Sequence, residues 1–267
     1  MDGVQETLSR EAESAAPCRG GGGVSAPEIS IVVPVLNEAR RIVPLVRRFA
    51  GDPRVELIVA DGGSTDGTPD LAARAGAHVV SAARGRGAQQ NAGARRARGA
   101  ILLFLHVDTQ LPSGALDVVV RSAAAAGVAG GGFRFALDRA SGGLRLVVGL
   151  TNLRTRFLRA PYGDQALFVK RCVFKKMGGF RELAIMEDLD FVRRMKKHGR
   201  IVVLPMEATT SSRRWMANGV LRTSLVNRLA VLMWTAGVSD RRIRKTYDRL
   251  LRRGDAETAR VTVDEIG

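Results

Sequence analysis

The chain has 267 residues, of which 45% are hydrophobic and 25% charged, and these proportions exclude a wholly disordered protein. Its 42 lysines and arginines against 26 acidic residues give a formal net charge of +16, which indicates an anionic partner: a nucleic acid, an anionic membrane surface or a phosphorylated substrate. Two cysteines are too few for a disulfide framework or a four-ligand zinc site. The best apolar run, residues 229–238, is about half of what a membrane-spanning helix needs.

Residues 1–27 are polar, lack the apolar segment of a secretory signal and are interpreted as a disordered leader. From residue 29 on, short apolar runs alternate with helix-like segments. The predicted strands are residues 29–35, 55–60, 77–81 and 100–107, and the predicted helices are residues 39–49, 69–75 and 87–98. Continuous apolar runs of this length are typical of strands buried on both faces. This first half therefore predicts a parallel sheet, with ligands at the carboxyl ends of its strands.

The second half of the chain is less regular. Helices are predicted over residues 113–126, 144–159, 187–198, 219–236 and 240–253, and strands over residues 128–137, 165–169 and 200–205. No repeat or linker interrupts the pattern. We therefore expect one α/β domain over residues 28–215, a Rossmann-like, mostly parallel sheet flanked by helices, and a basic helical C-terminal extension over residues 216–267.

Polar residues follow the predicted strands at four places. The first strand is followed by Asn37 and Glu38 and the second by residues 61–68, although helix caps and an Asx turn also explain these residues. Residues 84–91 after the third strand put arginines at a helix start, which suits a diphosphate. His106 and Asp108 after the fourth would point the same way on extended backbone, as metal ligands or as a buried histidine and a turn residue.

Taken together, these residues resemble glycosyltransferase family 2, enzymes of the GT-A fold that use nucleotide-activated sugars. The resemblance covers about residues 29–215 and rests on five motifs in the family's order: PVLNE (34–38), DGGSTDGT (61–68), GRGAQQNAGARRARG (85–99), HVD (106–108) and EDLD (187–190). The segments LLFLHVDT, GDQ (163–165) and SSRRW (211–215) are similar to a bacterial branch of small soluble members whose acceptors are poorly defined.

The resemblance implies roles for individual residues. It assigns the nucleotide-sugar pocket to Pro34, Asn37, Glu38, Asp61, Ser64, Asp66, Arg86, Asn91 and Asp108, with Asp61 on the base and Arg86 and Asn91 near the ribose and diphosphate. It assigns the acceptor or diphosphate loop to Gln165, Glu187, Arg213, Arg214 and Trp215, and the general base to Asp188. A single base with no second carboxylate as nucleophile implies direct displacement and inversion at the anomeric carbon.

The resemblance also implies a divalent cation, Mn²⁺ or Mg²⁺, on Asp108. His106 stands where the family has the first Asp of its DxD motif. An imidazole ligand favours Mn²⁺ over Mg²⁺; alternatively, only Asp108 binds the cation. Gly62 is a second departure, because many members have an Asp there.

The expected enzyme transfers a sugar from a UDP- or GDP-type donor to an unidentified hydroxyl acceptor, either lipid-linked or small. It is expected in the cytoplasm, and the basic C-terminal helices suggest an anionic membrane surface on its inner face as a further partner. One alternative is a basic nucleic-acid-binding protein that has kept a transferase fold. Another is a nucleotidyltransferase, although PVLNE replaces the basic Gly-rich loop typical of that class. Aromatic residues make up only 5% of the chain, and no nucleic acid is expected as a partner.

Overall fold

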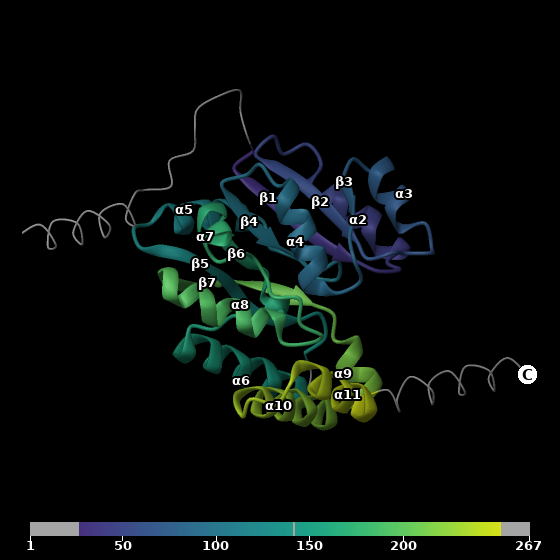
Figure 1. The fold of residues 1–267 in the computed structure, drawn as a ribbon, viewed down its shortest axis with the longest axis vertical. Coiled ribbons are helices and arrows are strands. Elements are labelled where there is room, and N and C mark those ends of the chain that lie inside the picture. The colour runs from purple at the N-terminus through teal and green to yellow at the C-terminus, as the bar shows by residue number, and fades with distance from the viewer. Residues whose placement is uncertain (1–26, 141, 252–267) are drawn as a thin grey trace, which may run out of the picture.

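The computed structural model describes residues 27–140 and 142–251 (Figure 1). At its centre lies a seven-stranded sheet with the order β3-β2-β1-β4-β6-β5-β7. Every neighbouring pair is parallel except the two that include β6. The prediction of a mostly parallel α/β sheet is therefore confirmed. The leader predicted over residues 1–27 and the end of the extension, residues 252–267, lie outside the described residues, apart from Pro27.

The elements follow one another as alternating strands and helices. The strands are β1 (Ile29–Val35), β2 (Val55–Asp61), β3 (His78–Ser81), β4 (Ile101–Phe104), β5 (Val128–Leu137), β6 (Leu167–Lys170) and β7 (Arg200–Thr210). The α-helices are α2 (Ala39–Phe49), α3 (Thr68–Arg74), α4 (Arg86–Arg96), α5 (Ala115–Ala124), α6 (Gly143–Leu158), α7 (Arg171–Lys176), α8 (Glu187–Met195), α9 (Arg213–Asn218), α10 (Val220–Thr235) and α11 (Asp240–Leu251). Two 3-10 turns, η1 (Gly163–Gln165) and η2 (Lys196–His198), complete the chain.

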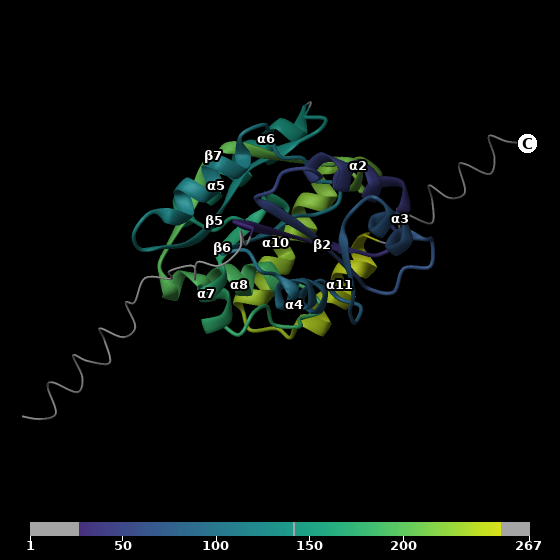
Figure 2. The same ribbon diagram turned by 90° about the horizontal axis from the view of Figure 1, so that it is seen from above.

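Helices cover both faces of the sheet (Figure 2). Alternate residues of β1 show why: Ile31 and Val33 pack toward α2, α3 and α5, whereas Val32 packs toward α4, α7 and α8. Successive side chains of a strand point to opposite faces, so a continuous apolar run fits a sheet with two covered faces. A third, smaller cluster joins β5 to α6 and α9 through Phe135, Leu144 and Trp215.

Three elements in the second half of the chain depart most from prediction. The short helices α7 and α9 were not predicted, and β7 continues to Thr210, five residues past its predicted end. Pro205 and Glu207 interrupt the apolar run of β7, and an irregular register beside Gly132 lets pairing with β5 continue past them. The predicted boundary at residue 215 lies inside α9.

A buried carboxylate holds the end of the sheet opposite the strand carboxyl ends. Glu56 in β2 is 6% exposed. It accepts hydrogen bonds from the Ser30 hydroxyl, from the backbone N–H of Arg98 and of Gly99, and from the Arg98 guanidinium at 3.0 Å. Burial alone raises the pKa of Glu56, but these hydrogen bonds outweigh burial and hold the pKa below its usual value of 4.5.

The lowered pKa of Glu56 predicts how stability depends on pH. A carboxyl group with a lower pKa in the folded state stabilises the fold above its unfolded pKa, and this contribution is lost as the pH falls below about 4.5 toward the folded pKa. We expect Glu56→Gln to be less stable than the wild type at pH 7 and the difference to shrink toward pH 3. Urea unfolding at both pH values measures this. An equal difference at the two would contradict the assigned pKa.

The C-terminal helices pack against the core domain. Helix α10 lies against α6 and α11, and the Asp240 carboxylate at the start of α11 accepts a hydrogen bond of 2.8 Å from the backbone N–H of Ala184. In the described part of the chain, we find no helix long and apolar enough to cross a membrane.

Candidate active site

The loops after β1 and β2 bind each other at the carboxyl edge of the sheet. The backbone N–H of Asn37 donates to the Ser64 hydroxyl at 2.8 Å, and the Asn37 side-chain oxygen accepts from the Thr65 N–H at 2.9 Å. The Asp66 carboxylate accepts from the Ala39 N–H at 3.0 Å, at the start of α2. Asn37 has a positive φ of 56°, a conformation that asparagine tolerates better than most residues. Asn37, Ser64 and Asp66 therefore shape the expected nucleotide pocket by joining its two loops.

Two further residues of the expected pocket lie beside these loops. Pro34 is in β1, opposite Ala60 of β2. The backbone N–H of Glu38 donates to Thr68 Oγ1 at 2.8 Å, and its carboxylate forms an ion pair of 2.6 Å with Arg41. Glu38 thus contributes to the junction of the two loops through its backbone and to the first turn of α2 through its side chain.

The Asp61 carboxylate is turned into its own loop. It accepts hydrogen bonds from the backbone N–H of Gly63 at 2.9 Å and of Ser64 at 3.0 Å, and from the Ser64 hydroxyl. With 6% exposure, Asp61 forms the Asx-type turn that was the simpler interpretation of this motif.

The structure also explains Gly62. The Gln89 side-chain amide donates to the backbone oxygens of Val35 at 2.7 Å and Ala60 at 3.0 Å and so joins the carboxyl ends of β1 and β2. A Cβ atom at residue 62 would lie 2.9 Å from the nitrogen of this amide. A side chain at residue 62, such as the aspartate that the resemblance implies for many family members, would therefore compete with Gln89 for the same space.

His106 and Asp108 do not share an extended strand. Strand β4 ends at Phe104, and the Thr109 N–H donates to the His106 carbonyl at 3.0 Å, which closes a turn. The backbone is therefore not extended here, and the condition under which both side chains would point the same way is not met. Asp108 lies 4.0 Å from the Arg213 guanidinium, and 31% of its side chain is exposed.

The His106 ring lies near the start of α8 instead. A Cβ atom at Gly163 would lie 3.5 Å from Cε1 of His106 and 3.2 Å from Oδ2 of Asp188. Burial, followed by the positive charges of Arg86 and Arg214, lowers the pKa of His106 to about 3. The imidazole is therefore neutral at pH 7.

Asp188 is held at the start of α8 by backbone groups. Its Oδ2 accepts a hydrogen bond of 2.8 Å from the Gly163 N–H, and its Oδ1 accepts one of 2.7 Å from the Leu189 N–H. Met186, immediately before α8, has a φ of 70°, which costs free energy for a residue with a side chain. The turn at Met186 and the Gly163 contact together fix the place of this carboxylate.

Two other acids beside Asp188 have raised pKa values. Burial and then the charge of Asp188 raise the pKa of Glu187, whose side chain lies 3.9 Å from Arg86. Burial and then Asp188 also raise the pKa of Asp164 to about 6, against the opposing effect of Arg154 and other arginines. Clusters of acids with perturbed pKa values are typical of functional sites.

The sequence interpretation quoted GDQ (163–165) for the resemblance but assigned no role to Gly163 or Asp164, and it missed Arg154. The Arg154 guanidinium in α6 lies 3.5 Å from the centre of the Tyr162 ring, a cation–π contact that joins α6 to the loop of η1. The sequence feature that could have identified Asp164 is an acidic residue inside the mainly apolar segment PYGDQALF. No sequence feature could have identified Arg154, because nothing distinguishes it from the other arginines of the helix.

Three expected site residues make structural contacts within the protein. Gln165 is fully buried and donates to the Phe133 carbonyl at 2.8 Å while accepting from the Tyr162 N–H at 2.9 Å. Trp215 is 8% exposed and packs on the Phe135 ring, with 6.1 Å between ring centroids. Both side chains therefore make contacts within the protein, and the ligand contacts expected of Gln165 and Trp215 stay a prediction.

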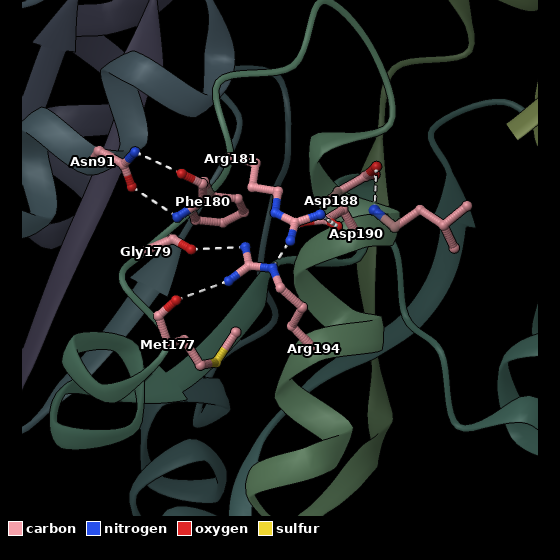
Figure 3. A network of polar contacts seen from close by, with 9 residues as sticks. Asn91, Met177, Gly179, Phe180, Arg181, Asp188, Asp190 and Arg194 are labelled. Atoms are coloured by element: carbon pink, nitrogen blue, oxygen red, sulfur yellow. Dashed lines mark hydrogen bonds and ion pairs between the residues drawn. The ribbon is translucent and has the colours of Figure 1, made fainter. Parts of the chain in front are cut away.

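Asn91 is the third of these residues (Figure 3). Its side chain donates to the Phe180 carbonyl at 2.9 Å and accepts from the Phe180 N–H at 2.8 Å. Its amide therefore holds the loop before α8, and its expected place near the ribose and diphosphate stays a prediction. Arg194 holds the same loop from α8: it donates to the Gly179 carbonyl at 2.7 Å and forms an ion pair of 2.7 Å with Asp190.

The fold is that of GT-A glycosyltransferases. A mannosyltransferase of Pyrobaculum calidifontis, solved in complex with GDP-Man and Mn²⁺, superimposes with a TM-score of 0.55 at 17% identity over 88% of this chain and 72% of the other. Glucosyl-3-phosphoglycerate synthase of Mycobacterium tuberculosis, solved with Mn²⁺, UDP and glucosyl-3-phosphoglycerate, gives a TM-score of 0.56 at 19% identity over 83% of this chain and 88% of the other.

Sequence similarity agrees with the fold. Residues 30–161 match the model of glycosyl transferase family 2. A stretch of 52 residues is 44% identical to glycosyltransferase AglJ of Haloferax volcanii. That stretch covers 20% of this chain and 17% of the relative. The resemblance drawn from the motifs is therefore confirmed.

Proposed function

We propose that the protein is an inverting glycosyltransferase that moves a sugar from a UDP- or GDP-type donor to a hydroxyl acceptor. The proposal rests on one observation above all: Asp188 and Glu187 lie at the carboxyl edge of the sheet together with Arg86. A carboxylate can accept the proton of an attacking hydroxyl, and a cation can stabilise a leaving diphosphate. The match of residues 30–161 to the model of glycosyl transferase family 2 supports the same reaction.

The residues present fit a divalent cation that the donor helps to bind. Asp108 is partly exposed at the carboxyl edge of the sheet and would hold the cation, and the neutral ring of His106 is a second candidate ligand. Among the described residues, no three His, Cys, Asp or Glu side chains gather into a metal cluster. This suits a cation that is bound by one or two protein groups and by substrate phosphates. When bound, such a cation supplies Lewis-acid stabilisation of the leaving diphosphate.

The chain's own residues would act on opposite sides of the sugar, one on the acceptor hydroxyl and the others on the leaving diphosphate. Asp188 would take the proton from the acceptor hydroxyl as that oxygen attacks the anomeric carbon. Arg86 and Arg213 would stabilise the negative charge that develops on the diphosphate as the bond to the sugar breaks. A single displacement of this kind inverts the configuration at the anomeric carbon.

The proposed partners follow from these groups and from the surface charge. They are a nucleotide-sugar donor, an acceptor hydroxyl on a lipid-linked or small molecule, and an anionic membrane surface on the cytoplasmic side; no nucleic acid is proposed. The solved relatives include proteins in complex with GDP-Man or with UDP, and this favours those two donor types. A protein that used this fold only to bind nucleic acid would not need the cluster of acidic residues around Asp188.

A thermal-shift panel tests the proposal. UDP, GDP, dTDP and CMP are each added with Mn²⁺, with Mg²⁺ or with EDTA. Ligand at 100 times its Kd stabilises the folded state by about 2.7 kcal/mol, which raises the Tm by roughly 5 to 10 °C for a domain of this size. We expect UDP or GDP to give such a shift with metal and a smaller one with EDTA.

The variant Asp108→Asn separates metal binding from nucleotide binding. It is expected to reduce the metal-dependent part of the shift and to keep the part seen in EDTA. Asp117→Asn, which changes an exposed aspartate of α5, is the matched control and should behave as the wild type. Absence of a shift with every nucleotide, together with salt-sensitive binding to RNA or DNA, would favour the nucleic-acid alternative.

A further inference from the structure

Large apolar side chains are exposed on the helices at one end of the molecule. Helices α6, α9 and α10 lie together at the lower end in Figure 1, away from α3 and α5. All ten exposed large hydrophobic residues found in the described part of the chain belong to these helices: Leu146, Leu150, Leu153, Phe157, Leu158, Met216, Leu221, Leu225, Leu229 and Leu232. We call this set the apolar surface. The concentration of all of them on three neighbouring helices marks an interaction site.

The spacing of these residues makes the surface continuous along each helix. In α6, Leu146, Leu150, Leu153 and Phe157 follow at intervals of four, three and four residues, and therefore share one face. In α10, Leu221, Leu225, Leu229 and Leu232 follow at intervals of four, four and three residues and also share one face. The other face of α10 is also apolar, since Val226 and Ala230 are buried. A helix that is apolar on both faces requires a second covering partner.

The charged residues of the three helices that carry the apolar surface are all positive. Helices α6, α9 and α10 contain no aspartate or glutamate. Arg145, Arg156, Arg222 and Arg228 are exposed on α6 and α10. Two copies of this chain that met through the same surface would bring these arginines together without a carboxylate on the three helices to pair with them. An anionic lipid surface, in contrast, supplies both an apolar interior for the leucines and phosphates for the arginines.

We infer that the apolar surface of α6, α9 and α10 is a membrane-docking face, with its leucines and Phe157 inserted among the acyl chains of an anionic bilayer. This inference deepens the proposed membrane association by naming the surface. It also relates that surface to the candidate site, because Arg154 of the same helix α6 contacts Tyr162 beside Asp164 and Asp188. Such a placement favours the lipid-linked class of acceptor.

Sedimentation of the full chain with vesicles tests the docking face. The vesicles are phosphatidylcholine with phosphatidylglycerol at about 3:1, or phosphatidylcholine alone, and no nucleotide is present. The wild type is expected to bind the anionic vesicles and to bind the neutral ones more weakly. Leu221→Gln/Leu225→Gln removes two inserted side chains, which are 80% and 64% exposed, and should lower the partition coefficient at least about tenfold.

Two arginine variants provide the matched comparison. Arg222→Gln on α10 should weaken binding to the anionic vesicles about fivefold. Arg121→Gln changes an exposed arginine of α5, at the opposite end of the molecule in Figure 1, and should leave binding unchanged. Because the replaced leucines are exposed, the Tm of Leu221→Gln/Leu225→Gln should match that of the wild type.

Three results would overturn the inference: no binding of the wild type to anionic vesicles, equal binding of the leucine variant, or equal weakening by Arg121→Gln. A dimeric wild type that becomes monomeric in the leucine variant, with no vesicle binding, would assign the surface to a second copy instead. The nucleotide-dependent thermal shift is measured separately on the same variant. Absence of the thermal shift in the wild type and in every variant would count against the proposed transferase. The vesicle assay would still test the docking face, because it contains no nucleotide.

Discussion

Asp188→Asn is expected to lower sugar transfer by about 10²- to 10⁴-fold, the range that a general base contributes. Asparagine has almost the shape of aspartate but cannot take the proton of the acceptor hydroxyl. Nucleotide binding should remain, because the proposed donor contacts lie on other elements. Turnover of the donor with a responsive acceptor, or slow hydrolysis of the donor in its absence, measures the first effect. The thermal shift with UDP or GDP measures the second.

The geometry around Asp188 defines the controls for this variant. Both carboxylate oxygens accept backbone hydrogen bonds, from Gly163 and from Leu189, whereas the amide offers only one acceptor oxygen. The variant is therefore expected to lose roughly 1 to 2 kcal/mol of stability, and activity is compared well below the Tm of both proteins. Asp164→Asn is the matched neighbour. Asp164 Oδ1 is buried without a hydrogen-bond partner among the described residues, so this carboxylate is turned partly inward, and we expect a loss below about tenfold.

Loss of activity in Asp164→Asn but not in Asp188→Asn would move the base to Asp164 and contradict the proposed mechanism. This outcome is a real test, since the pKa of Asp164 is raised to about 6 and a base works best with a pKa near the working pH. The two variants therefore distinguish two carboxylates that lie within electrostatic reach of each other.

Residue type and spacing predict well the strands and helices that carry this site. The bounds of β1, α2 and β5 agree with their predictions to the residue, because apolar periodicity directly records which faces are buried. Parallel strands place their carboxyl ends at one edge, so the clusters at Asn37, Asp61 and Asp108 were expected at the same edge from sequence alone.

The direction of a single side chain is beyond such reasoning. Asn91 and Gln165 are polar residues in family motifs, yet both make hydrogen bonds to nearby backbone that fix loops. The sequence distance from Asn91 to its partner Phe180 is 89 residues, and no local pattern records such a contact. His106 illustrates the same limit: one turn after Phe104 changes where its ring lies.

Periodicity also does not say what covers an apolar face. Helix α6 was predicted from the same repeat that identifies a core helix, but its Leu153 and Phe157 are 53% and 76% exposed. The repeat reports that a face requires an apolar environment. Whether that environment is the protein core or a bilayer depends on the packing of distant segments.

Asp190→Ala is expected to cause the largest loss of stability among the variants considered. Asp190 is 5% exposed and pairs with Arg194 at 2.7 Å and with Arg181 at 3.2 Å (Figure 3). The Arg194 guanidinium is itself mostly buried, with 18% of its side chain exposed. Removing one member of a buried pair leaves the other charge uncompensated and costs about 3 to 5 kcal/mol. For a domain of this size, the Tm should fall by at least about 6 to 12 °C.

An exposed ion pair gives the matched control for Asp190. Asp117 pairs with Arg54 at 2.6 Å, but both side chains are nearly half exposed, so Asp117→Ala should cost less than about 1 kcal/mol. Equal falls in Tm for the two variants would show that burial does not decide the strength of these pairs here. Arg194 also donates to the carbonyls of Met177 and Gly179, in the loop that leads to α8. Asp190→Ala should therefore lower activity as well as stability, because the start of α8 holds Asp188 in place.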